Sequence, residues 1–247
     1  MQNVKYWIKN SPTPIAKLVR QSYQPVKQLE LPVIPIATKL IYQLHKVSHI
    51  LFTSLFRRMY WTPLFKSQIK GGKGLYLYSG MPQLLGNVSI TVGKGCRWSG
   101  ISTVSGRCNN QDRPCLTIGE NVDIGWQTSI AVGTSVTLDN NVRMAGRAFL
   151  AGYPGHPINP YDRAKGLPDE DHQVGAIHLK ENVWLGTGVS IIGGVTVGEN
   201  SIIGAGSVVT HNIPANVVAA GVPAKVIRKL NPNELRIHSE DNIDTLA

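Results

Sequence analysis

Apolar residues recur at every sixth position over two stretches of the chain, and eleven of these twelve positions are Leu, Ile or Val. The positions are Ile118, Ile124, Ile130, Val136, Val142 and Ala148, then Leu179, Leu185, Ile191, Val197, Ile203 and Val209. An α-helix would need a period of 3.6 residues, so these two series do not predict helices. A short strand alternates its faces, and a corner after every six residues keeps the same face turned inward.

Three such six-residue units close one triangular coil, and stacked coils pair their strands in parallel around a continuous apolar column. Gly and Asn lie between the units, for example at Gly119 and Asn121, and both tolerate the left-handed backbone of tight corners. We therefore predict an all-β solenoid, a left-handed parallel β-helix, over residues 76–213. Its first coils follow the period less closely, and residues 107–114 interrupt it.

Residues 152–176 separate the two series and are rich in Pro, Gly and charge, which predicts a loop that protrudes from the β-helix. A long loop inside a regular solenoid usually has a function. Residues 169–171, all acidic, could contact a substrate or anchor the loop to a neighbouring chain, but we favour a solvated turn. Residues 214–247 are predicted to leave the β-helix as a C-terminal extension with a basic segment at residues 225–229.

Residues 1–75 differ from the rest and form a predicted helical arm. Between Ile36 and Tyr60, apolar residues follow helical spacing and basic or polar residues occupy the other face, which predicts an amphipathic helix. The arm holds 12 Lys and Arg against one acidic residue, Glu30, so all of the net charge of +10 belongs to it. We expect it to cap the end of the β-helix and to contact an anionic membrane surface. No recognition motif for nucleic acid accompanies the charge.

Three cysteines without a C-x-x-C pair argue against a disulfide framework and favour free thiols in a reducing compartment. The first 30 residues lack the features of a signal peptide, and no run of 18 apolar residues exists. The cytoplasm, with peripheral contact at the inner face of the cytoplasmic membrane, is the expected location.

Residues 182–228 closely resemble the hexapeptide-repeat acyltransferases, in particular the galactoside and maltose O-acetyltransferases and their relatives in polysaccharide biosynthesis. Gly155–His156–Pro157 in the predicted loop matches the motif that carries the catalytic histidine of that family. The resemblance implies an O-acetyltransferase that uses acetyl-CoA. Its acceptor would be a saccharide hydroxyl of a surface polysaccharide or its precursor.

His156 is the candidate catalytic residue. A free hydroxyl is a weak nucleophile near neutral pH, and a neutral imidazole within hydrogen-bond reach can take its proton as the attack on a thioester begins. No Ser-His-Asp nucleophile pattern is evident, so direct attack by the acceptor is the simpler mechanism. The alternative is that His156 only packs or caps a turn.

The resemblance also implies where CoA binds, in a groove between neighbouring subunits of a homotrimer. The matching positions include His211, where relatives commonly carry Lys, so the phosphate contact here would depend on pH. Each position could equally be a corner residue or a solvated charge. The implied residues are Trp184, Thr187, Ala205, Gly206, Thr210, His211, Lys225 and Arg228.

Two other activities remain open at this point. One is N-acyl transfer to an amino sugar. The other is a zinc site like that of the γ-type carbonic anhydrases, which share this fold and bind zinc through three histidines. His172 and His178 flank the loop of His156, but their spacing does not specify tetrahedral ligands. We expect no metal.

Overall fold

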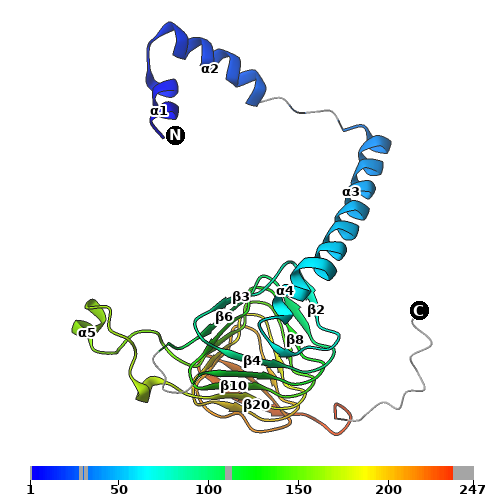
Figure 1. Cartoon of the computed structure of the whole chain (residues 1–247), viewed down its shortest axis with the longest axis vertical. Coiled ribbons are helices and arrows are strands. Elements are labelled where there is room, and N and C mark those ends of the chain that lie inside the picture. Colours follow the sequence, from blue (N-terminus) through cyan, green and yellow to red (C-terminus); the bar gives the residue numbers. More distant parts are fainter. Residues whose placement is uncertain (1, 28–29, 31–32, 109–112, 236–247) are drawn as a thin grey trace. The chain divides into compact units, whose positions relative to one another are not determined.

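The structure is a computed structural model that describes residues 2–27, 30, 33–108 and 113–235 (Figure 1). The chain divides into two compact units, residues 1–51 and 52–247. Of the predicted C-terminal extension, residues 214–247, the part after Leu235 lies outside the described residues.

The first unit is helical and contains α1 (Gln2–Asn10), α2 (Pro14–Lys27) and most of α3 (Pro35–Phe56). Arg20 of α2 donates to the carbonyl oxygens of Lys9 and Ser11 and so ties α2 to the end of α1. No residue of α3 is buried, although the helix is rich in apolar side chains. None of the described helices is long and apolar enough to cross a bilayer.

The second unit begins with the end of α3, which continues into a turn of π-helix, Arg57–Trp61, and then α4 (Thr62–Lys66). Phe65 of α4 is buried, and its ring meets that of Trp98 edge to face, with the centroids 5.2 Å apart. Trp61 also packs against the apolar core. Trp61 and Phe65, both within the predicted arm, thus pack against the apolar core, and the guanidinium of Arg57 lies 4.1 Å from the centre of the Tyr76 ring.

The remainder of the second unit is built of three sheets, whose strands follow one another in turn along the chain. The first sheet contains β1 (Lys70–Gly71), β4 (Ser89–Val92), β7 (Cys115–Ile118), β10 (Ser135–Leu138), β13 (Ile177–Leu179) and β16 (Thr196–Val197). The second contains β2 (Tyr76–Tyr78), β5 (Arg97–Ser99), β8 (Asp123–Ile124), β11 (Arg143–Met144), β14 (Trp184–Leu185), β17 (Ile202–Ile203), β19 (Val217–Gly221) and β20 (Ala224–Lys229). The third contains β3 (Gln83–Leu85), β6 (Thr103–Gly106), β9 (Ser129–Val132), β12 (Phe149–Ala151), β15 (Ser190–Ile192) and β18 (Val208–Val209).

The six-residue series point inward, as predicted. Leu150 pairs in register with Ile130 on one side and Ile191 on the other, and all three are buried. The corners use the left-handed backbone, with Asn182 and Asn200 both at a φ of 60°. The parallel pairing and the repeat fit a left-handed β-helix, which Figure 1 shows as a stack of coils.

The β-helix continues past the end that the sequence predicts. Ile213 pairs with Val197, and β19 pairs in parallel with β17, before β20 turns back antiparallel on β19. The prediction that residues after 213 leave the β-helix is wrong for β19. Ile213 follows Val197 by 16 residues, whereas Val197 follows its neighbour Leu179 by 18, so a shorter corner breaks the six-residue count.

Candidate functional site

The coils have three corners, which we number by the sheets that they join. The first corner leads from the first to the second sheet, the second corner from the second to the third, and the third corner back to the first. Residues 152–176 are inserted at the third corner, between β12 and β13, and contain α5 (Pro160–Ala164) and a 3₁₀ turn, Asp171–Gln173. This insertion is called the loop below, and it projects from the coils (Figure 1).

His156 is an exposed residue near the start of the loop. Hydrogen bonds hold the backbone just before His156 and the carbonyl group of His156 itself. The N–H of Gly155 donates to Asp169 Oδ2 at 3.0 Å, and Gln173 Nε2 donates to the carbonyl oxygen of His156 at 3.3 Å. Gly155 has a φ of 81°, which favours glycine at this position. The imidazole is thus attached to a hydrogen-bonded segment of backbone and is exposed to solvent.

Asp169 is buried, so our interpretation of the acidic segment as a solvated turn is wrong at this residue. Its carboxylate accepts a hydrogen bond of 2.7 Å from Arg107 Nε, and the two side chains are only 3% and 5% exposed. Burial disfavours the charge of Arg107, but the hydrogen bonds to Asp169 and Asp171 outweigh that effect and raise its pKa. Asp171 itself is exposed.

Arg107 is a residue that the sequence analysis did not select. It follows β6, and its N–H donates to the carbonyl of Val132 at the third corner. In the sequence, residues 107–114 are visible only as a segment that interrupts the six-residue repeat. A basic residue at that interruption, in a protein whose long loop contains adjacent carboxylates, is the signal that could have identified the pair.

Three of the residues implied for CoA come together at the second corner. Thr187 follows β14, and Ala205 and Gly206 follow β17 in the next coil. The N–H of Gly206 donates to the carbonyl of Thr187 at 2.8 Å, so the two corners are stacked. All three residues lie on the outside of the coil, and their side chains or Cα atoms are exposed.

The other implied residues lie elsewhere in the second unit. Thr210 and His211 lie at the third corner, where their side chains are 2.9 Å apart. Trp184 lies on the second sheet, half exposed, beside a hollow of about 730 Å³ that the segment after β20 also lines. Lys225 and Arg228 lie on β20, at the end of the second sheet.

Arg228 already has an anionic partner. Its two terminal nitrogens donate to both oxygens of Glu234, each at 2.8 Å. These hydrogen bonds lower the pKa of the Glu234 carboxyl to about 2. A phosphate would therefore have to compete with this carboxylate for Arg228, whereas Lys225 is exposed.

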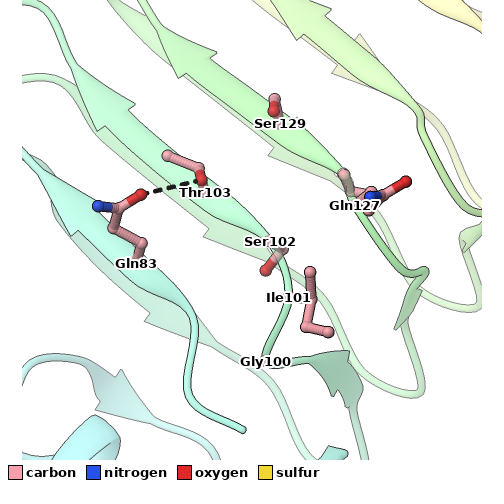
Figure 2. Close-up of a pocket in the computed structure, with 8 residues that line it drawn as sticks. Gln83, Gly100, Ile101, Ser102, Thr103, Gln127 and Ser129 are labelled. Atoms are coloured by element: carbon pink, nitrogen blue, oxygen red, sulfur yellow. Dashed lines mark hydrogen bonds between the residues drawn. The ribbon is translucent and has the colours of Figure 1, made fainter. Parts of the chain in front are cut away.

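A second hollow, of about 420 Å³, lies at the second corner beside the coils that precede the loop (Figure 2). No charged residue lines it, and its walls combine amide and hydroxyl groups with apolar surface that includes Ile101. The Thr103 hydroxyl donates to Gln83 Oε1 at 3.3 Å. No local pattern in the sequence indicates this hollow, because its residues are spread over three coils. They are Gln83, Gly100, Ile101, Ser102, Thr103, Gln127, Thr128 and Ser129.

The histidines considered for zinc do not form a ligand set. His178 Nε2 lies 2.9 Å from Asp139 Oδ2 on the first sheet, and His172 Nδ1 lies 3.2 Å from Glu170 in the loop. Across the described ranges, no three His, Cys, Asp or Glu side chains group as metal ligands. The zinc alternative therefore has no support in this geometry.

Comparison with known proteins identifies the repeat. Residues 176–211 match the family described as bacterial transferase hexapeptide (six repeats). The galactoside O-acetyltransferase of Escherichia coli (strain K12) is 40% identical over 126 residues, which make up 51% of this chain and 60% of that protein. The galactoside O-acetyltransferase of Lactococcus lactis is 37% identical over 123 residues, 50% of this chain and 51% of that protein. The chain thus spans less than two thirds of the length of either relative.

Among solved structures, the fold is similar to that of AntD, an N-acyltransferase from Bacillus cereus, in a mutant form that holds dTDP-4-amino-4,6-dideoxyglucose and coenzyme A. The TM-score is 0.57 at 19% identity, and the similarity covers 70% of this chain and 90% of AntD. At this identity the comparison concerns the fold alone. The chain therefore carries the bacterial transferase hexapeptide repeat over residues 176–211, and about half of it is similar in sequence to galactoside O-acetyltransferases.

Proposed function

We propose that this protein transfers an acetyl group from acetyl-CoA to a hydroxyl group of a saccharide, with His156 as the general base. The observation that carries the proposal is the position of His156. It lies in a Gly-His-Pro motif on an ordered, exposed loop of a β-helix whose sequence is similar to two galactoside O-acetyltransferases. A surface polysaccharide or its precursor is the acceptor class that we favour, as the sequence resemblance implies.

In the proposed reaction the neutral imidazole of His156 takes the proton of the acceptor hydroxyl as its oxygen attacks the thioester carbonyl. The carbon–sulfur bond then breaks, and the imidazolium returns the proton to the departing thiolate. The products are the acetyl ester and CoA with a free thiol, so protons and electrons balance. General base catalysis of this kind typically contributes about 10²- to 10⁴-fold to the rate.

The separation of the implied CoA residues supports a site built from two chains. Thr187, Ala205 and Gly206 lie along the second corner, whereas His156 and His211 lie at the third. These corners are different edges of one triangular coil, separated by the third sheet. A threefold assembly can bring the second corner of one copy beside the third corner of its neighbour, and we propose this arrangement.

The order of the coils supports a division of this groove between donor and acceptor. Along the third sheet, the loop leaves after β12, which pairs with β9 on one side and β15 on the other. The hollow of Figure 2 is lined by residues of β3, β6 and β9 and of the corners before them, in coils that precede the coil of β12. Thr187 and Ala205 lie in coils on the other side. We assign the hollow to the saccharide and the later coils to CoA, with His156 of the neighbouring copy between them.

The first test is the release of free thiol from acetyl-CoA in the presence of a panel of sugars that includes amino sugars. His156→Ala should lower kcat by about 10²- to 10⁴-fold. His172→Ala is the matched control, because His172 is an exposed histidine of the same loop and should retain wild-type activity. Full activity of His156→Ala would refute the assigned role. Transfer to amino sugars only would replace the O-acetyl assignment by N-acyl transfer.

The second test concerns the two-chain site and uses mixed assemblies. Ala205→Trp should block the CoA groove, since Ala205 is exposed at the second corner. Assemblies formed from equal amounts of His156→Ala and Ala205→Trp chains should recover about one quarter of wild-type activity, because one interface in four combines two intact halves. No recovery from assemblies that demonstrably contain both chains would show that each site belongs to one chain.

We further propose that the arm rests on an anionic membrane surface. Its charge supports this, with 12 basic residues against one acidic residue in residues 1–75. So does α3, whose apolar side chains are more than half exposed at Leu40, Leu44 and Leu51. A helix with exposed apolar residues and cations can lie in the interface, and each Lys or Arg adds roughly 1 kcal/mol near anionic lipid. Association of this arm with its own copies would bring like charges together.

Co-sedimentation with vesicles tests the membrane contact. The full chain should bind vesicles that contain phosphatidylglycerol and should bind pure phosphatidylcholine vesicles far less, with binding that weakens as salt is raised. A chain limited to residues 52–247, which has its own core, should bind neither. Equal partitioning of the two chains would refute the proposal.

A further inference from the structure

The loop is joined to the coils by a buried ion pair whose partners lie far apart in sequence. Arg107 belongs to the coils, since its backbone N–H donates to Val132, and Asp169 belongs to the loop. Arg107 Nε donates to Asp169 Oδ1 at 2.7 Å, and Arg107 Nη2 donates to the carbonyl oxygen of Asp169 at 2.9 Å. With only 5% and 3% of the two side chains exposed, little water can replace either partner.

Asp169 uses its second carboxylate oxygen for a different purpose. Asp169 Oδ2 accepts the N–H of Gly155 at 3.0 Å, and Gly155 directly precedes His156. One buried carboxylate thus links the coil, through Arg107, to the backbone that carries the imidazole. The far side of His156 is tied to the same part of the loop, because Gln173, in the 3₁₀ turn after Asp169, donates to its carbonyl oxygen.

The physical chemistry of this arrangement favours a single loop position. A charge buried without a partner costs far more than an exposed one, so Arg107 and Asp169 resist separation. If Asp169 moves, the Gly155 N–H and the guanidinium lose this acceptor together. A general base, for its part, must stay within hydrogen-bond reach of its proton, and a displacement of about 1 Å can cost about 100-fold in rate.

We infer that Arg107 and Asp169 are positioning residues that hold the loop so that His156 faces the reacting groups. The inference rests on the proposed function, and it adds two residues that neither the repeat nor the Gly-His-Pro motif contains. Neither side chain needs to touch the substrate. Their contribution is to fix the backbone at Gly155 and therefore the place from which the imidazole acts.

Asp171 provides a matched control in the same cluster. It accepts a hydrogen bond of 2.7 Å from Arg107 Nη1, but its side chain is 92% exposed and makes its ion pair in water. Exposed ion pairs contribute little, since water and salt screen them. A change at Asp171 therefore removes the same type of contact to the same guanidinium while the link to Gly155 remains.

The test compares Asp169→Asn with Asp171→Asn in the full chain. In Asp169→Asn the amide nitrogen can only donate, so it cannot replace both accepting oxygens. We expect kcat to fall by about 10- to 100-fold, with the KM for acetyl-CoA within about twofold, because the implied CoA residues lie at other corners or other coils. Asp171→Asn should stay within about twofold of wild type in both constants.

Limited trypsin digestion supplies a readout that does not depend on activity. Arg163 and Lys165 are exposed in the loop, so release of the loop should speed cleavage there by about tenfold or more in Asp169→Asn but not in Asp171→Asn. Thermal melting verifies that the coils remain folded. Arg107→Lys serves as a second variant that keeps the charge but loses the forked geometry, and it should share both defects.

The outcomes separate the two proposals. Unchanged cleavage in Asp169→Asn would overturn the inference whatever the activity shows, and so would full activity of that variant. If wild-type protein transferred no acetyl group to any sugar tested, the proposed function would fail. The cleavage rates alone would then decide whether the ion pair holds the loop.

Discussion

The coils and the loop of this protein are held in place in different ways. In the coils, an inward residue such as Leu150 lies between equivalent residues of the coils on either side, Ile130 and Ile191, and the same arrangement repeats along the whole column. The loop is tied to the coils by individual polar side-chain contacts, which include the ion pair of Arg107 with Asp169 and the hydrogen bond of Tyr153 with Ser105.

This contrast explains how a repetitive scaffold can carry a site of defined geometry. Stability in the coils is the sum of many similar apolar contacts between neighbours. The geometry of the loop depends on a few contacts, among them a buried ion pair. Substitutions in the coils should therefore change the free energy of unfolding, whereas substitutions at the base of the loop should change local order and activity first.

Leu150→Ala should have the largest effect on stability. It leaves a cavity in the column and should lower the free energy of unfolding by about 2–5 kcal/mol. Phe149→Ala is the control on the same strand, because Phe149 points outward and is 42% exposed. Denaturant unfolding at equal protein concentration measures both. Equal losses in the two variants would contradict the inward and outward assignment.

Asn200→Ala should have the next largest effect, at a corner of the coils. Asn200 has a φ of 60°, donates to Asn216 at 2.8 Å and accepts from Asn182 at 2.9 Å. Alanine in this left-handed conformation should cost about 1–2 kcal/mol in the same unfolding experiment. Asn200→Gly tolerates the backbone and should cost less. A greater loss for glycine than for alanine would show that the conformation of this corner does not matter.

Tyr153→Phe should have a smaller effect, confined to the loop. It removes the hydrogen bond of 3.0 Å to Ser105 Oγ, worth about 0.5–1.5 kcal/mol. Amide hydrogen exchange at Gly155 should accelerate by less than about tenfold, the fold-change that corresponds to about 1.4 kcal/mol. Exchange in the coils should not change. Faster exchange at buried coil amides would mean that the loop and the coils unfold together and are not stabilised separately.

Much of the fold could be predicted from the sequence because a period of six is incompatible with a helix and leaves few architectures. The inward positions from Ile118 to Val209 follow directly. The end of the β-helix did not, since the shorter corner before Ile213 shifts the count by two residues although the strands still pair. Periodicity measures spacing along the chain, whereas parallel pairing only requires that the strands align.

The site could be predicted in part. The Gly-His-Pro motif is local in sequence and therefore visible, which is how His156 was selected. Arg107 and Asp169 are 62 positions apart and follow no period, so no local pattern in the sequence predicts that they pair. The same holds for the hollow of Figure 2, whose residues come from three coils.

The smallest effect is expected at Cys96 in the coils, where ionisation of the thiol makes the free energy of unfolding depend on pH. Burial raises the pKa of its thiol above the ordinary value of 9.0, and its Sγ lies 3.1 Å from the carbonyl oxygen of Gly119. A group whose pKa is raised by folding binds its proton more tightly in the folded state. Its contribution to stability is therefore complete well below the ordinary pKa of 9.0 and declines as the pH rises through and beyond that value.

Unfolding experiments between about pH 8 and pH 10 should thus show a decline in stability that is shallower in Cys96→Ala. Tyr78, whose pKa is also raised mainly by burial, remains in both proteins and cannot account for the difference. The exposed thiols Cys108 and Cys115 should react with Ellman's reagent in the folded state, whereas Cys96 should react only on unfolding. Identical pH profiles for the two proteins would indicate that the Cys96 thiolate is as stable inside the coil as in water, contrary to the burial of this position.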